Sequence, residues 1–222
     1  MKKLIVSAFI ALAIGLSVPS ITRAQGTIYF SNLGATPAGS LPAAADSWLA
    51  TEFDSGTNSS GYRLDSIQLG MAAASGAPGG LAAMLYTSLP FGAAPYPGSS
   101  VGSLTGPSNP STAGVYIYSP AGDLLLSPRT SYFIVLTAAT PVADGAYPWS
   151  YASTWSYNRI DAWNGTLCYN STDGASWHSI SSVYPLFAIN ATPEANVPEP
   201  NTAAVLGLGL LALLLRKCGT HA

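Results

Sequence analysis

The clearest strand in the chain is the stretch Tyr132-Phe133-Ile134-Val135-Leu136-Thr137-Ala138. Aromatic and β-branched residues of this kind fit a pleated, half-buried surface. Similar short runs recur on both sides of it, separated by Gly, Pro, Ser, Thr, Asn and Asp. Regular short strands with turn residues between them predict an all-β fold, an antiparallel β-sandwich of the jelly-roll-like kind. The predicted strands are 27–30, 48–53, 63–70, 81–86, 114–118, 132–138, 151–157, 166–169 and 184–190.

Three dipeptides between these runs are typical of tight turns. Asp144-Gly145, Asn164-Gly165 and Asp173-Gly174 accept the positive φ that two-residue hairpin loops require, so we expect antiparallel neighbours on either side of each. The segment 90–110 is rich in proline and glycine, which favour loops over ladders. It predicts a long surface excursion with at most one short strand at 101–104.

The N-terminus carries an export signal. Lys2 and Lys3 precede an uncharged apolar run over 4–18, and the segment before the expected cleavage site ends with the small residue Ala24. These are the three regions of a secretory signal peptide, and the run is shorter than the ~20 residues that span a membrane. We expect cleavage after Ala24, which assigns 1–24 to the signal peptide and 25–196 to one extracytoplasmic domain.

The C-terminus combines a short motif with an apolar helix. Pro198-Glu199-Pro200 precedes the apolar run 202–215, and Arg216 and Lys217 follow it at once. Cations next to a membrane helix stay on the cytoplasmic face. The pattern in 197–222 therefore predicts a transmembrane helix at 202–215, with the middle domain outside the cytoplasm.

The charge of the middle domain excludes one class of partner. All three lysines lie in the terminal segments. The middle domain contains three arginines, Arg63, Arg129 and Arg159, and nine carboxylates, which gives it a formal charge of −6. Binding to nucleic acids depends on neutralising phosphates with lysine and arginine. We therefore expect no nucleic-acid partner.

The C-terminal order of Pro-Glu-Pro, short apolar helix and basic cluster resembles the PEP-CTERM sorting signal, whose residues here are Pro198, Glu199, Pro200, Arg216 and Lys217. The resemblance implies a protein of a Gram-negative, polysaccharide-producing bacterium. It implies anchoring in the inner membrane until an exosortase cleaves near the motif. The released protein would then reach the cell envelope or the extracellular matrix.

The middle domain resembles the choice-of-anchor extracellular domain, a family named for its alternative C-terminal anchors. That resemblance implies a β domain and no catalytic residues. It rests on Ala50-Thr51-Glu52-Phe53-Asp54, Tyr62-Arg63-Leu64-Asp65-Ser66-Ile67-Gln68-Leu69, Leu85-Tyr86-Thr87, Leu126-Ser127-Pro128-Arg129-Thr130-Ser131-Tyr132-Phe133-Ile134-Val135-Leu136, Gly174-Ala175-Ser176-Trp177 and Tyr184-Pro185-Leu186-Phe187-Ala188-Ile189.

Residues suited to nucleophilic or metal chemistry are scarce in the domain. Cys168 and His178 flank the Asp173-Gly174 turn, where a Cys-His dyad is one interpretation and a buried apolar thiol is the simpler one. One Cys and one His cannot fill a zinc site, and we expect neither a disulfide nor a bound metal. Calcium would have Asp161, Asn164 and Asp173 as loop donors, but no Asp-x-Asp-x-Asp-Gly pattern is present.

Carboxylates are the remaining acid–base groups. Glu52 and Asp54 are two residues apart on a predicted strand and so point to one face, about 6 to 7 Å apart. That spacing falls in the range of a glycosidase pair. Two solvated residues at a strand end are the simpler interpretation.

Aromatic residues are dense between 147 and 177. Trp149 and Tyr151, and then Trp155 and Tyr157, are two apart and would share strand faces, with Trp163 following. An exposed face of this kind would stack on sugar rings, whereas a buried one would be sandwich core.

These patterns predict an exported, non-enzymatic surface or matrix protein without a cofactor. Its expected partners are exosortase, the inner membrane before processing, and exopolysaccharide. A carbohydrate-binding module that uses the aromatic residues is the alternative. A glycoside hydrolase that uses Glu52 and Asp54 is a third hypothesis.

Overall fold

The computed structural model describes residues 26–91 and 94–195, which form β-strands and loops with no helix among them. The expected signal peptide, Pro-Glu-Pro motif and membrane helix lie outside the described residues. The strands are β1 Thr27–Ser31, β2 Gly39–Ala43, β3 Trp48–Asp54, β4 Tyr62–Met71, β5 Ser75–Gly76, β6 Leu81–Phe91, β7 Ala94–Thr105, β8 Gly114–Pro120, β9 Leu125–Leu126, β10 Ser131–Ala138, β11 Gly145–Ala152, β12 Asn158–Arg159, β13 Asn164–Ser171, β14 His178–Ile180, β15 Tyr184–Pro185 and β16 Phe187–Pro193.

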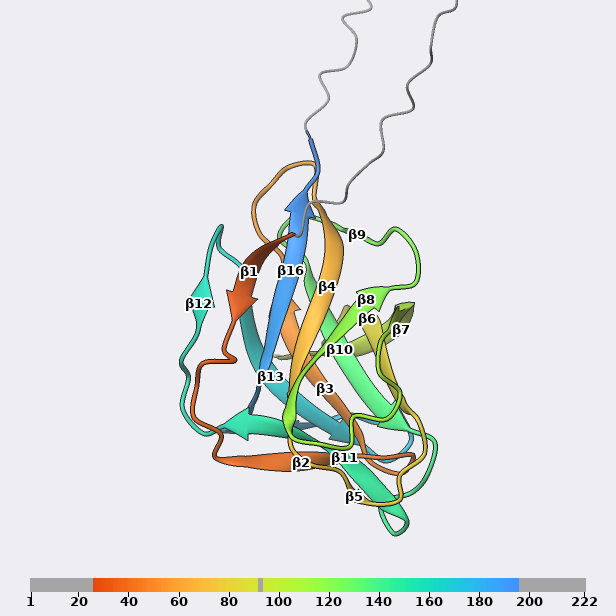
Figure 1. Cartoon of the computed structure of the whole chain (residues 1–222). Helices are drawn as coiled ribbons and strands as arrows, with labels where there is room; N and C mark the ends of the chain where they lie inside the picture. Colours follow the sequence, from red (N-terminus) through yellow and green to blue (C-terminus); the bar gives the residue numbers. More distant parts are fainter. Residues whose placement is uncertain (1–25, 92–93, 196–222) are drawn as a thin grey trace, which may run out of the picture.

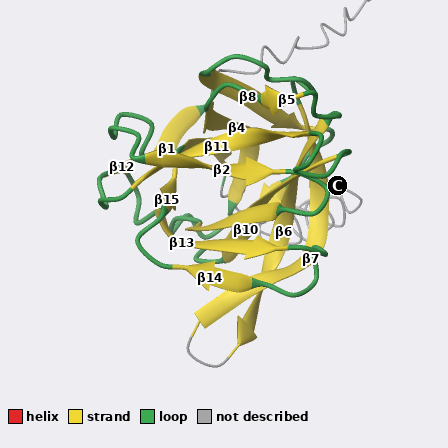
Figure 2. Ribbon diagram, turned by 90° about the horizontal axis from the view of Figure 1, so that it is seen from below, coloured by secondary structure: helices red, strands yellow, loops and turns green. Residues whose placement is uncertain are grey.

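The strands form one antiparallel sheet that curls around a core (Figure 1). Its main path runs β12-β1-β16-β4-β8-β7-β6-β10-β3-β13-β14, and β11 joins it through β4 while pairing with β2, β5 and β15. Figure 2 shows β13, β10 and β6 on one side and β1, β4 and β11 on the other. The two halves are joined through β7 and β8, which pair only at their ends, Leu104 with Pro120 and Thr105 with Ser119. The all-β, antiparallel prediction is confirmed.

Alternation along β10 divides the apolar residues between two clusters. Tyr132, Ile134 and Leu136 face the large core between the two halves of the sheet, whereas Phe133 and Val135 face the other way. Both sets are buried, because the second set is covered by aromatic side chains on the outer face of the sheet. Successive strand residues point to opposite faces, so this apolar run supplies both clusters.

Four details of the predicted strand pattern are wrong. The strand expected at 151–157 is β11, which ends at Ala152, and Asn164-Gly165 starts β13 instead of forming a turn. Gly145 has a φ of 142°, but β11 pairs with β2, β4, β5 and β15 and not with the strand before it. The segment expected as a loop over 90–110 contains β7, which pairs with β6 along most of its length.

The chain enters and leaves the sheet at one end. Thr27 at the start of β1 is paired with Ala191 near the end of β16, and both strands meet this end at the top of Figure 1. Asn58, in the loop after β3, donates from Nδ2 to the carbonyl oxygen of Glu194 (2.9 Å), so β3 also ends there. β13 is antiparallel to β3 and therefore runs away from this end, which places the β13–β14 turn at the opposite end.

No helix within residues 26–91 and 94–195 has the length and apolar character needed to span a bilayer.

Candidate functional site

The aromatic residues that the sequence singled out do not share one face. Trp149 and Trp163 are 1% and 0% exposed, and both belong to the large core. The indole N–H of Trp149 donates to the carbonyl oxygen of Leu186 (2.9 Å), and Trp163 stacks on Tyr29 with ring centroids 5.3 Å apart. For these two residues the core interpretation holds, and neither ring can reach a sugar from solvent.

The other three candidates lie nearer the surface. Trp155 is 38% exposed and makes edge contacts with Tyr157 (4.9 Å between centroids) and Tyr184 (4.8 Å). The half-buried Tyr157 also stacks on Phe30 of the core. Tyr151 is half-buried over Gly39, where a β-carbon would meet its hydroxyl group at 2.7 Å. These rings form a small group that packs largely on itself and on the core.

A second aromatic cluster covers the outer face of the sheet around β3, β10 and β13. Its buried members are Ala50, Phe133, Val135 and Tyr169, and Phe133 and Tyr169 make an edge contact with centroids 5.5 Å apart. The strand register brings these side chains together, because Phe133 pairs with Tyr86 and Glu52, and Tyr169 pairs with Ala50. The half-buried residues that pack against it are Trp48, Met84, Tyr86, Tyr96 and Trp177.

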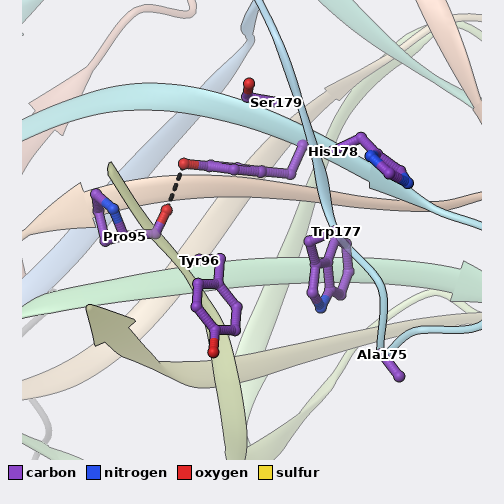
Figure 3. Close-up of a pocket in the computed structure, with 7 residues that line it drawn as sticks. Pro95, Tyr96, Ala175, Trp177, His178 and Ser179 are labelled. Atoms are coloured by element: carbon purple, nitrogen blue, oxygen red, sulfur yellow. Dashed lines mark hydrogen bonds between the residues drawn. The ribbon is translucent and has the colours of Figure 1, made fainter. Parts of the chain in front are cut away.

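A pocket of ≈ 480 Å³ opens beside this outer cluster, between β7 and β14 (Figure 3). Figure 3 shows the rings of Tyr96 and Trp177 projecting in the same direction with a gap between them. Both rings are half-buried, so each keeps a surface open to solvent. The pocket is lined by Pro95, Tyr96, Tyr169, Ala175, Trp177, His178 and Ser179.

Tyr169 joins the two sides of the pocket. Its hydroxyl group donates a hydrogen bond to the carbonyl oxygen of Pro95, which ties β13 to the start of β7. Burial and the negative charge of Glu52 raise the pKa of the Tyr169 hydroxyl, so it stays protonated as a donor. Glu52, 4% exposed, lies on the same face of the sheet.

The turn before β14 is held by its own polar groups. Asp173 Oδ1 accepts hydrogen bonds from the backbone N–H of Ala175 (2.8 Å) and of Ser176 (2.7 Å), and from Ser171 Oγ (2.8 Å). These bonds favour the carboxylate and lower the pKa of Asp173. Gly174 has a φ of 71°, as the Asp173-Gly174 pattern predicted. The pattern also predicted the β13–β14 pairing that follows, and this is confirmed.

The two carboxylates considered for hydrolysis differ in their surroundings. Glu52 is buried, whereas Asp54 is half-buried and its Oδ1 accepts a hydrogen bond from Ser131 Oγ (2.5 Å). Neither residue lines the pocket between β7 and β14.

Cys168 and His178 are not opposite each other across the hairpin. Cys168 pairs with Ile180, whereas His178 pairs with Asn170, which lies two residues after Cys168 on β13. Cys168 is 1% exposed, and burial raises the pKa of its thiol to about 12, so at neutral pH it is a thiol and not a nucleophilic thiolate.

The oxygen donors considered for calcium have other partners, and Asn164 Oδ1 accepts a hydrogen bond from Arg159 Nη1 (3.5 Å). Asp161 accepts hydrogen bonds from the backbone N–H (3.2 Å) and Oγ1 (2.5 Å) of Thr57, and Asp173 is engaged in its own turn. Within the part of the chain that the structure describes, no group of three His, Cys, Asp or Glu side chains could hold a metal ion.

The pocket includes residues that sequence reasoning only partly identified. Trp177 and Tyr169 belong to the dense aromatic segment, but they were not singled out because their face depends on the pairing of β13 with β3. Tyr96 lies in the stretch expected to be a loop. The strand that carries it is visible only once β6 and β7 are paired.

Comparison with known families gives a match at the C-terminal end of the chain. Residues 196–217 match the PEP-CTERM protein-sorting motif, and this segment contains Pro198, Glu199, Pro200, Arg216 and Lys217. Neither curated proteins nor solved structures give a match to the chain, and the resemblance to the choice-of-anchor domain stays a prediction. The sorting motif indicates a secreted surface protein that exosortase processes and that a C-terminal membrane anchor holds before processing.

Proposed function

We propose that this chain is a non-enzymatic protein of the cell envelope or extracellular matrix, exported, held at the inner membrane and then released into an exopolysaccharide-rich exterior. The observation that carries the proposal is the sorting motif at 196–217, which follows the last strand, β16, by only a few residues. The whole β domain therefore lies on the side of the motif that cleavage would release.

The arrangement of the domain's ends supports anchoring by one end. Because β1 begins beside the end of β16, the segments that precede and follow the domain leave from the same end. The β13–β14 turn lies at the opposite end and would face away from the membrane. This geometry suits a domain that contacts its surroundings before and after release.

The state of the reactive side chains supports a non-enzymatic role. Cys168 is a protonated core thiol, and Asp54, Asp161 and Asp173 accept hydrogen bonds from neighbouring hydroxyl or backbone groups. Catalytic carboxylate pairs need two environments that separate their pKa values around a substrate cleft. Glu52 and Asp54 share a strand face, but the pocket is lined by other residues.

Carbohydrate recognition is the second candidate function, and the pocket between β7 and β14 is the observation that favours it. Two half-buried aromatic rings beside a concave surface are typical of small-ligand sites.

The test of sorting replaces Pro198, Glu199 and Pro200 together with alanine in the producing bacterium. We expect an uncleaved form that stays with the membrane fraction, whereas the unchanged protein is released. Glu194→Ala is the matched control, because it changes a nearby acidic residue outside the matched segment. Release of the triple variant at the normal rate would contradict the sorting proposal. New reducing ends on polysaccharides incubated with the purified protein would contradict the non-enzymatic role.

A further inference from the structure

The pocket between β7 and β14 has the wall chemistry of a sugar-binding site. Tyr96 and Trp177 are large, flat and half-buried, and both pack on the outer aromatic cluster instead of into the main core. Figure 3 shows the gap between their rings. An apolar sugar face that entered this gap would bury its C–H groups against the rings, which is the favourable contribution of aromatic walls in such pockets.

Polar groups lie along the pocket beside these rings. Ser179 is exposed on β14 and pairs with Tyr169, so its hydroxyl group, which both donates and accepts hydrogen bonds, lies on the same face of the sheet as that ring. The imidazole ring of His178 projects away from Tyr96 and Trp177 (Figure 3). The carbonyl oxygen of Pro95 and the hydroxyl oxygen of Tyr169 form the far wall. Alternating donors and acceptors near an apolar surface match the hydroxyl groups of a sugar ring.

The charge of the pocket selects among sugars. The described residues that line it include no lysine, arginine or carboxylate, and the described part of the chain contains no lysine. The net charge of the domain is negative, which repels polyanions. A uronic-acid or sulfated polysaccharide would therefore have no lysine or arginine to pair with its charge here, whereas a neutral sugar needs no such partner.

The pocket is also built before any ligand arrives. The bonds from Ser171, Ala175 and Ser176 to Asp173 fix the turn, and the Gly174 backbone rests on the ring of Trp48. The turn leads directly into Trp177. A preformed wall lowers the entropy that binding must remove.

We propose that this pocket binds a neutral saccharide segment, with Tyr96 and Trp177 as the aromatic walls and with Ser179 and the hydroxyl oxygen of Tyr169 as polar contacts. The inference rests on the proposed function for the source of the ligand, a neutral polysaccharide of the surrounding matrix. The pocket walls from the β13–β14 turn lie away from the end where the chain enters and leaves. The site therefore stays accessible on the anchored form as well as on the released form.

The test measures binding to the full chain in mild detergent by calorimetry and by tryptophan fluorescence. The probes are cellohexaose, mannohexaose and laminarihexaose, with polygalacturonate as the charged comparator. We expect at least one neutral hexasaccharide to bind and to change the emission of Trp177. Trp177→Ala and Tyr96→Ala should each raise Kd at least about tenfold, as truncation of a pocket anchor does.

Trp155→Ala is the matched control, since Trp155 is a partly exposed tryptophan in the other aromatic group. It should leave Kd unchanged. Thermal unfolding of each variant identifies any loss of fold, and Ser179→Ala tests the pocket without removing a ring. Absence of binding to all three hexasaccharides, preference for polygalacturonate, or loss of binding in Trp155→Ala with retention in Trp177→Ala would each overturn the proposal.

Failure of this inference is distinguishable from failure of the proposed function. The binding assay uses the uncleaved chain, so its result does not depend on processing by exosortase. A protein that is released normally but binds no neutral sugar contradicts only the pocket. A protein that binds sugar but is never released contradicts only the sorting proposal.

Discussion

The indole ring of Trp48 covers the backbone of Gly174. A β-carbon at residue 174 would lie 3.0 Å from Cε3 and 3.1 Å from Cδ2 and Cε2 of that ring. Trp48 begins β3 and its indole N–H donates to the carbonyl oxygen of Ala45 (3.0 Å), so the ring is fixed in place. This contact joins the first residue of β3 to the turn that carries Trp177 into the pocket.

Gly174→Ala should therefore destabilise the β13–β14 turn. The substitution adds a β-carbon against an indole ring and forces a residue other than glycine to a φ of 71°. The left-handed conformation alone costs about 1–2 kcal/mol, and the steric contact adds to it. Denaturant unfolding should show a loss of at least about 1 kcal/mol.

Gly122→Ala is the control for this measurement, because a β-carbon at residue 122 would meet no atom within 4 Å. It should leave the free energy of unfolding nearly unchanged. Equal effects of the two substitutions would contradict the role of the Trp48 contact.

Asp173→Asn should remove part of the acid sensitivity of the fold. Hydrogen bonds from the backbone of Ser176 and Ala175 and from Ser171 lower the pKa of Asp173 below its ordinary value of 3.8. A carboxyl group whose pKa is lowered by folding stabilises the protein above its unfolded pKa, and this stability is lost as the pH falls below that value. The stability difference between the unchanged protein and Asp173→Asn should thus shrink between pH 5 and pH 2.

Chemical denaturation at a series of pH values measures this difference. Asp144→Asn, at an exposed carboxylate of another turn, is the control and should follow the unchanged protein. A constant difference across the acid range would show that Asp173 acts on the turn without its charge.

Most of the sheet follows from local sequence pattern, and the errors share a cause. Strands β1, β3, β4, β6, β8, β10, β13 and β16 coincide with or overlap runs of apolar, β-branched and aromatic residues. Strand β7 was missed because Pro95 and Pro97 cannot donate to a ladder. In the structure they lie near one end of β7, where only β6 pairs with it, and β8 joins β7 at Leu104 and Thr105. Long-range pairing therefore accommodates prolines that local pattern excludes.

Prediction of the candidate pocket depends even more on knowing which strands pair. The Asp173-Gly174 turn was visible in the sequence, and so was the local density of aromatic residues. Which aromatic rings are buried was not visible, because Trp163 and Trp177 lie in similar polar surroundings along the chain. Packing separates them: Trp163 meets three aromatic rings in the core, whereas Trp177 lies over the outer face of the sheet.

Cys168 should resist thiol reagents in the folded protein. Burial raises the pKa of the thiol to about 12, so the reactive thiolate is scarce at pH 8, and the side chain is 1% exposed. Modification by a disulfide reagent should be slow in the native state and fast in denaturant. A Cys218→Ser background keeps the second cysteine of the chain out of the assay, and rapid native modification would contradict a core role.

Trp163→Ala should destabilise the fold far more than Trp155→Ala does. Trp163 is fully buried, and its ring lies 5.1 Å from Tyr62, 5.3 Å from Tyr29 and 6.0 Å from Phe53 between centroids. Removal of a buried aromatic ring leaves a cavity and costs about 3–5 kcal/mol. Trp155 is partly exposed, and its removal should cost less than about 1 kcal/mol.

Trp163→Phe separates two contributions to this effect. The indole N–H of Trp163 is buried and has no hydrogen-bond partner among the described residues, and such a donor costs about 1–3 kcal/mol. Phenylalanine keeps an aromatic ring between Tyr29 and Phe53 and removes that donor. The free energy of unfolding, measured in urea, should therefore fall clearly less for Trp163→Phe than for Trp163→Ala. Equal losses would mean that the six-membered ring alone cannot fill the space, and that the shape of the indole sets the packing of this core.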